Sequence, residues 1–124
     1  MGRRELGKLG ERLACEYLER RGYEVVGQNV RVGKHDEIDL IVREGRVTVF
    51  VEVKTRSSDE FGLPEESITR RKRQSIERAI VAYVRKHSEI KQVRFDVIAV
   101  LIPSQGGAKT LKHFRAVGGS LAFL

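Results

Sequence analysis

The chain has 124 residues, which suffices for one domain with a single hydrophobic core and is too short for two. Hydrophobic residues make up 40% of it and charged residues 33%, a balance that excludes an intrinsically disordered chain. The formal net charge of +7 favours a polyanionic partner such as nucleic acid, because each phosphate that a basic side chain neutralises releases condensed counterions. An acidic protein or an anionic membrane surface would fit the same charge.

Cys15 is the only cysteine, so an intrachain disulfide and a cysteine-based zinc cluster are both excluded. His35, His87 and His113 show no ligand-like spacing, and we expect them to be structural or exposed. No apolar run approaches the length of a membrane span, and the charged residues that follow Met1 do not resemble a signal peptide. We therefore predict a cytoplasmic protein with no membrane partner.

Hydrophobic periodicity predicts a chain that begins with a helix and three strands. Apolar residues at helical spacing, with Gly22 after the last of them, predict a helix over about residues 4–21. Val-rich alternation predicts strands over residues 23–32, 37–43 and 46–55. The last two strands would form a β-hairpin with Glu44-Gly45 as its two-residue turn.

The second half of the chain is predicted to add a helix, an interior strand and either an edge strand or a tail. Residues 56–66 carry Ser, Gly and Pro and predict a loop, after which Ser67 or Thr69 would cap a helix running to about Lys86. Residues 94–102 are apolar on both faces, which indicates an interior strand reached by a right-handed parallel crossover. The core would span about residues 4–102, with an edge strand over residues 111–117 or a tail in residues 103–124. We expect one α/β domain over residues 1–124, with a mixed central sheet flanked by helices.

The pairing of the second and third strands predicts which side chains share a face of the sheet. With Glu44-Gly45 as the turn, Asp39 lies opposite Phe50 and Glu37 nearly opposite Glu52. One face of the hairpin is then wholly apolar, contains Ile38, and must be core. The side chains that gather at one end of the other face are Glu37, Asp39, Glu52 and Lys54.

Clustered acids of this kind suit a divalent cation, which removes the repulsion between like charges placed across a ladder. Mg²⁺ needs only one or two carboxylates together with waters and phosphate oxygens, so Asp39 and Glu52 fit that demand. Lys54 would then reach the attacking water or a phosphate oxygen. On spacing alone, ordinary surface charges with Lys54 offsetting Glu52 and Asp39 are the alternative, because Glu-x-Lys tripeptides are common.

The same residues resemble a known pattern. An acidic residue on one strand followed by Glu-x-Lys on the next resembles the PD-(D/E)xK signature of restriction-endonuclease-like nucleases, with Ile38 in place of the proline. Over about residues 2–100 the chain also resembles the YraN-like uncharacterised bacterial family, which is similar to archaeal Holliday junction resolvases. The motifs that carry this resemblance are Gly7-x-x-Gly10-Glu11-x-x-Ala14, Asn29-x-Arg31, Glu37-Ile38-Asp39-Leu40-Ile41, Phe50-Val51-Glu52-Val53-Lys54-Thr55-Arg56 and Arg94-Phe95-Asp96-Val97.

The resemblance implies a restriction-endonuclease-like αβββαβ core and a set of catalytic residues. Asp39 and Glu52 would be the metal ligands, with Mg²⁺ or Mn²⁺ as the cofactor. Lys54 would orient the nucleophilic water and stabilise the charge that develops on the phosphate. Glu11, at the margin of the first helix's apolar stripe, matches an acid that would complete the metal's coordination shell.

A run of basic residues, Arg70-Arg71-Lys72-Arg73, opens the second predicted helix. A solvated, charged first turn is the ordinary explanation of such a run. Cations are disfavoured at a helix N-terminus, however, and Lys72 projects onto the face that contains Ile76 and should point toward the sheet. We therefore predict that these four residues, together with Arg56 and Arg31, bind phosphates beside the carboxylates.

These observations favour a metal-dependent endonuclease that hydrolyses phosphodiester bonds in DNA, with branched DNA as one candidate substrate. The alternative is a nucleic-acid-binding module that keeps the nuclease fold without turnover. A protein-interaction domain, whose basic face meets an acidic partner, ranks third because it leaves the clustered acids unexplained. Resolvase-like activity calls for two active sites, so a homodimer is expected by analogy alone.

Overall fold

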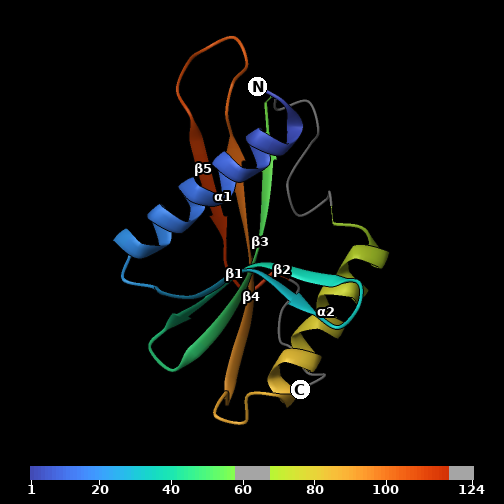
Figure 1. The fold of residues 1–124 in the computed structure, drawn as a ribbon. Coiled ribbons are helices and arrows are strands. Elements are labelled where there is room, and N and C mark those ends of the chain that lie inside the picture. Colours follow the sequence, from blue (N-terminus) through green and yellow to red (C-terminus); the bar gives the residue numbers. More distant parts are fainter. Residues whose placement is uncertain (58–67, 118–124) are drawn as a thin grey trace.

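The computed structural model describes residues 1–57 and 68–117, and within these ranges it contains two helices and five strands. In chain order they are α1 (Arg3–Arg20), β1 (Glu24–Val32), β2 (Asp36–Glu44), β3 (Val47–Arg56), α2 (Arg70–Arg85), β4 (Gln92–Leu101) and β5 (Thr110–Phe114). The strands form a mixed sheet in the order β1-β2-β3-β4-β5, in which β3 and β4 are parallel and the other neighbours antiparallel. The α/β class, the mixed sheet and the parallel crossover through α2 are confirmed (Figure 1).

The boundaries of these elements correct a few details of the sequence prediction. Arg56 is the last residue of β3 rather than part of a loop, and the predicted loop from residue 58 onward lies outside the described residues, as does the tail from residue 118. Thr69 caps α2, because its hydroxyl oxygen accepts a hydrogen bond from the Lys72 backbone N–H at 3.1 Å. Neither α1 nor α2 combines the length and the apolar character that a membrane span requires.

Each helix covers one face of the sheet, and Figure 1 shows α1 and α2 on different sides of the strands. This arrangement follows from alternation, because successive side chains of a strand point to opposite faces. The buried residues around α1 are Ala14, Cys15, Leu18, Leu40, Val42, Val49, Val51, Val53, Ile98 and Val100, whereas those around α2 are Ile38, Ile41, Phe50, Ile76, Ala79, Ile80, Phe95 and Val97. The predicted separation of faces in β2 and β3 therefore holds, with one exception at Ile38.

The hairpin of β2 and β3 differs from the prediction in its register. Glu44 pairs with Val47, so the turn is Gly45-Arg46, and Gly45 takes the positive φ of 60° that this turn requires. Ile41 rather than Asp39 lies opposite Phe50, a shift of two residues along β2. Because two residues is one full period of a strand, the shift leaves the faces unchanged but moves Glu52 away from Glu37 and toward Asp39.

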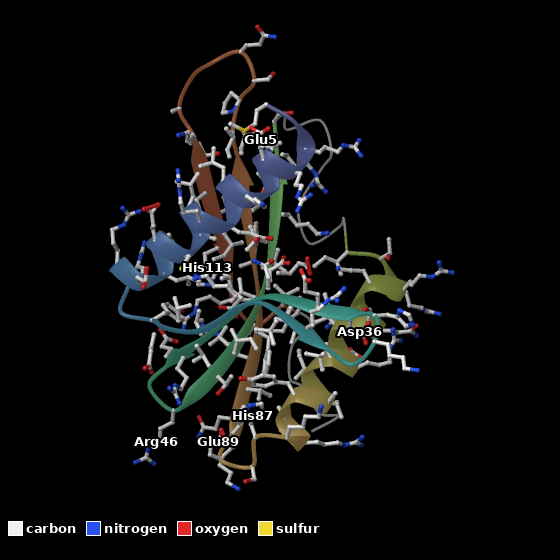
Figure 2. The ribbon with its side chains drawn as sticks, in the orientation of Figure 1. Glu5, Asp36, Arg46, His87, Glu89 and His113 are labelled. Atoms are coloured by element: carbon white, nitrogen blue, oxygen red, sulfur yellow. The ribbon has the colours of Figure 1, made fainter. Side chains whose placement is uncertain are left out.

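At its open end the hairpin separates into two arms, and we call the point where β2 and β3 separate the fork. The ladder between β2 and β3 ends at Leu40 and Val51, whereas β3 stays paired with β4 as far as Arg56. Beyond the fork β1 and β2 turn aside toward α2, where the Ser75 hydroxyl donates a hydrogen bond of 2.7 Å to Asp36 (Figures 1 and 2). This turn explains why Ile38 packs in the α2 cluster, contrary to the prediction that it would share a face with Leu40.

Candidate active site

Asp39 and Glu52 are the first residues beyond the last paired position of the β2–β3 ladder. Because the ladder has ended, the backbone N–H of Val53 needs an acceptor other than a β2 carbonyl. The Asp39 carboxylate supplies it, since its Oδ2 lies 2.8 Å from the Val53 nitrogen. This bond holds Asp39 at the fork and engages only one of its two carboxylate oxygens.

Glu52 is a buried carboxylate, only 8% exposed, on the opposite arm of the fork. Burial and then the negative charge of Asp39 are the main effects that raise the pKa of Glu52 to about 7. A hydrogen bond between the two carboxyl groups raises the pKa of Glu52 further. Two cations work against this rise, namely Lys72, whose Nζ lies 3.7 Å from Glu52 Oε2, and Lys54.

A third carboxylate reaches the fork from α1, through a close approach between this helix and β3. A Cβ atom at Gly10 would overlap the side chain of Thr55, so the approach requires glycine at this position. The next residue, Glu11, consequently lies near Asp39. Burial first and the charge of Asp39 second raise the pKa of Glu11, and a hydrogen bond with Asn29 partly offsets the rise.

The donor set at the fork suits a hard cation that takes few protein ligands. Within residues 1–57 and 68–117, no group of three or more Asp, Glu, His or Cys side chains is arranged to hold a metal ion. Mg²⁺ keeps several waters and uses one or two carboxylates, so Asp39 and Glu52 meet its requirement as a pair. The raised pKa of Glu52 agrees with this, because the negative charge of Asp39 beside it disfavours a second ionised carboxylate and a bound cation would favour one. The predicted roles of Glu11 and Lys54 stay predictions.

The uncharacterised protein family UPF0102 matches residues 10–100, a range that includes Glu11, Asp39, Glu52 and Lys54. The chain belongs to this family. A UPF0102 protein of Pelotomaculum thermopropionicum is 42% identical over 91% of the chain and 94% of the relative. Others from Beutenbergia cavernae and Renibacterium salmoninarum are each 44% identical, covering 91% and 92% of the chain and 95% and 96% of the relatives. The resemblance to the YraN-like family is thereby confirmed, whereas the names of these relatives state no activity.

In this UPF0102 protein, the residues predicted to bind phosphate have different surroundings. Lys72 faces the sheet as predicted, and its charged partner there is Glu52. Arg73 lies 3.5 Å from Glu77 one helical turn on, and an Arg56 guanidinium nitrogen donates to the Thr55 carbonyl at 3.0 Å. The exposed residues of the set are Arg31, Arg70 and Arg71. Phosphate binding by all six stays a prediction.

Asn29 is a site residue that reasoning from the sequence missed. Its φ of 49° lies in the left-handed region, and it sits across from Asp39, between the pairs Gln28–Leu40 and Val30–Ile38. Asparagine tolerates this conformation better than most residues. The available signal was the Asn29-x-Arg31 motif, which the sequence offered only as part of the UPF0102 resemblance and without a partner such as Glu11.

Proposed function

We propose that the protein is a Mg²⁺- or Mn²⁺-dependent endonuclease that hydrolyses phosphodiester bonds in DNA, of the PD-(D/E)xK type. The observation that carries this proposal is the adjacent carboxyl groups of Asp39 and the buried Glu52, which lie together where β2 and β3 separate, in a chain of net charge +7. A structural ion pair has no need of two adjacent acids, one of them buried. A site that exchanges a proton for a divalent cation does need them.

Each residue of the fork has a distinct part in the proposed reaction. Asp39 and Glu52 would hold the cation, and Asp39 keeps its position through the Val53 N–H. When bound there, a divalent ion supplies polarisation of the phosphate and a lowered pKa for a bound water. Lys54 follows Glu52 on the same face of β3 and acts as a point charge toward the phosphate. Glu11 interacts with Asp39 from α1 and would complete the coordination shell of the cation.

Cleavage assays with Mg²⁺ or Mn²⁺ on duplex, single-stranded, flap and four-way DNA test the proposal. Asp39→Asn keeps an acceptor for Val53 and Glu52→Gln keeps the size of the side chain, so both remove charge with little change in shape. We expect each to lower kcat at least about 100-fold, since loss of even an outer-shell partner of a metal typically costs 10–100-fold. Glu89→Gln is the control, because Glu89 lies beside Arg46 at the far end of the sheet (Figure 2) and should leave the rate unchanged. If wild type cuts none of the substrates with either metal, the proposal is wrong.

A nucleic-acid-binding module without turnover is the second candidate, and one observation favours it. Lys72 already compensates the charge of Glu52 at 3.7 Å, so the acids can persist without a metal ion. This candidate predicts salt-sensitive DNA binding that survives Glu52→Ala, because phosphate contacts rather than the acids would supply the affinity. A calorimetric titration with Mg²⁺ distinguishes the nuclease from the binding module. Saturable binding that Asp39→Asn and Glu52→Gln each abolish supports the nuclease, and no binding supports the module.

A further inference from the structure

A cavity of about 370 Å³ lies between α1 and β1, and Glu11 forms part of its wall. Because Glu11 interacts electrostatically with Asp39, the cavity borders the carboxylate pair without being the same site. Its volume falls within the roughly 300–1,000 Å³ that is typical of small-ligand pockets. We propose that this cavity binds an unpaired nucleobase next to the phosphodiester held at the fork. The substrate class would then be single-stranded or branched nucleic acid, an inference that rests on the proposed function.

The charged residues of α1 make one end of the cavity basic and the other end acidic. Lys8, Arg12, Glu16 and Glu19 all line it, and their spacing places them in one stripe along the helix. The N-terminal half of the stripe is basic and favours phosphate oxygens. The C-terminal half is acidic, repels phosphate, and accepts hydrogen bonds from amino groups such as the exocyclic amine of cytosine. A nucleotide therefore fits with its phosphate toward Lys8 and its base toward Glu19.

The opposite wall of the cavity presents two side-chain amides from β1. Gln28 and Asn29 are both exposed, and each offers a donor and an acceptor in the fixed geometry that matches the edge of a base. The left-handed backbone of Asn29 interrupts the regular pairing of β1 with β2, and its side chain hydrogen-bonds Glu11 at the border of the carboxylate site. An amide wall facing a charged helix is suited to hydrogen-bonded recognition of a polar, planar group.

A base that is paired and stacked within a duplex does not suit this cavity. A paired base is stacked on its neighbours and its hydrogen-bonding edge is occupied, so only an unstacked base can enter a cavity between a helix and a strand. No aromatic side chain is among the described residues that line it, which are Lys8, Glu11, Arg12, Cys15, Glu16, Glu19, Gln28 and Asn29. Recognition must therefore come from hydrogen bonds rather than stacking, and it should favour bases with an amino group over thymine.

Equilibrium binding in EDTA tests the inference without any cleavage. The probes are short homopolymers of deoxycytidylate and deoxythymidylate, an abasic strand of the same length, and a duplex of matched length. We expect wild type to bind the cytidylate strand about tenfold more tightly than the thymidylate, abasic and duplex probes, the value of one good base contact. Equal affinity for the cytidylate and abasic strands would overturn the proposal, and so would binding of the duplex as tight as that of the cytidylate strand.

Matched variants locate the base contact. Gln28→Ala and Glu19→Ala should each reduce the preference for cytidylate to about threefold or less, while Gln92→Ala, an exposed amide at the far end of the sheet, should keep it in full. Lys8→Ala should instead weaken binding of every strand and lower the salt slope by about 0.7, the value of one phosphate contact to a single strand. A preference that survives both Gln28→Ala and Glu19→Ala overturns the assignment to this cavity.

The test keeps the failure of this inference distinct from failure of the proposed function. Base preference is measured without metal, so it holds or fails regardless of turnover. Suppose that the protein prefers cytidylate through Gln28 but cuts no substrate with Mg²⁺ or Mn²⁺. This result would support base binding in the cavity and contradict the proposed nuclease activity. Cleavage of all four DNA forms at equal rates, without any base preference, would refute the cavity and sustain the nuclease.

Discussion

Asp39 has a structural role in addition to its proposed role as a metal ligand. Its Oδ2 accepts the hydrogen bond of the Val53 N–H at the point where β2 and β3 separate. Without an acceptor at this half-buried position, the unpaired N–H would cost about 1–3 kcal/mol. Loss of activity in an Asp39→Ala variant would therefore mix a structural effect with a chemical one. Asn at this position keeps the acceptor and isolates the effect of the charge.

Glu52 makes the stability of the protein depend on pH. Its pKa is about 7 in the folded protein against 4.5 for the free side chain, so between these values the folded state holds a proton that the unfolded state has released. The contribution of Glu52 to the free energy of unfolding is therefore fully present below about pH 4.5. It is lost as the pH rises through about 7. We expect Glu52→Gln to remove this decline in the free energy of unfolding, measured by urea titration across that range. An identical decline in the variant would contradict this account of Glu52.

Mg²⁺ adds a second readout to the same experiment. A cation that binds the folded state stabilises it by mass action, and at this site it competes with the proton on Glu52. At pH values above about 7, Mg²⁺ should therefore raise the urea midpoint of wild-type unfolding. Near pH 4.5 the increase should be much smaller. Glu52→Gln should show little response at either pH. The exposed Glu89 supplies the control, since Glu89→Gln should respond as wild type does.

At the scale of elements, the approach of α1 to β3 decides where Glu11 lies. Gly7 and Gly10 both lie inside α1, where alanine would be preferred by roughly 1 kcal/mol on helix propensity alone. A Cβ at Gly10 would overlap Thr55, whereas one at Gly7 would meet no atom within 4 Å. Gly10→Ala should therefore destabilise the fold by about 1–3 kcal/mol and displace Glu11. Gly7→Ala should be neutral or stabilising.

Thermal and urea unfolding of the two glycine variants check this prediction, and cleavage assays on the folded fraction check its consequence. We expect Gly10→Ala to lose activity beyond its loss of folded protein, because Glu11 moves away from the fork. A Gly10→Ala protein as stable as the Gly7→Ala protein would show that α1 does not need this close approach.

Element types and faces were predictable because they depend on local periodicity. The alternation in residues 47–53 assigns Phe50 and Val51 to opposite faces regardless of register, and the structure agrees. The register itself depended on which two residues form the turn. Glycine at position 45 fits the first central residue of a hairpin turn as well as the second, so the sequence left this choice open.

The fork was beyond the reach of sequence reasoning. It exists because β1 and β2 turn toward α2, and contacts such as Ser75 to Asp36 join residues that are far apart in the chain. The prediction nevertheless brought Asp39, Glu52 and Lys54 together, since a shift of two residues keeps side chains on the same face. Asn29 was missed for the same reason that the fork was missed, because its role depends on the irregular pairing of β1.

On the scale of the whole molecule, a buried polar network joins distant parts of the chain. Asp96 of β4 is fully buried and accepts hydrogen bonds from Arg94, His113 and the Ala116 backbone. Arg94 also donates to Tyr23 at 2.9 Å and to Glu44 at 2.7 Å, and the Tyr17 hydroxyl lies 3.0 Å from His113. Figure 2 shows His113 beside α1, so the network ties this helix to β2, β4 and β5.

Asp96 should be the carboxylate that the fold tolerates losing least. Burial acts on it most strongly and would raise its pKa, but hydrogen bonds from His113 and Arg94 outweigh burial and hold the pKa below its ordinary value of 3.8. A folded pKa below the unfolded one contributes stability above about pH 3.8 that is lost as the pH falls further. We expect Asp96→Ala to cost about 3–5 kcal/mol, because it removes the buried carboxylate that both Arg94 and His113 contact.

Glu24→Gln provides the contrast, because it removes one partner of the exposed Arg43–Glu24 ion pair, with nitrogen and oxygen 3.0 Å apart, and should cost no more than about 1 kcal/mol. Urea unfolding of both variants at neutral pH measures the difference. Asp96 packs with the α1 side of the sheet rather than at the fork, so Asp96→Asn should keep metal binding at Asp39 and Glu52 while losing stability. Loss of Mg²⁺ affinity in folded Asp96→Asn would show instead that the network and the carboxylate pair act as one unit.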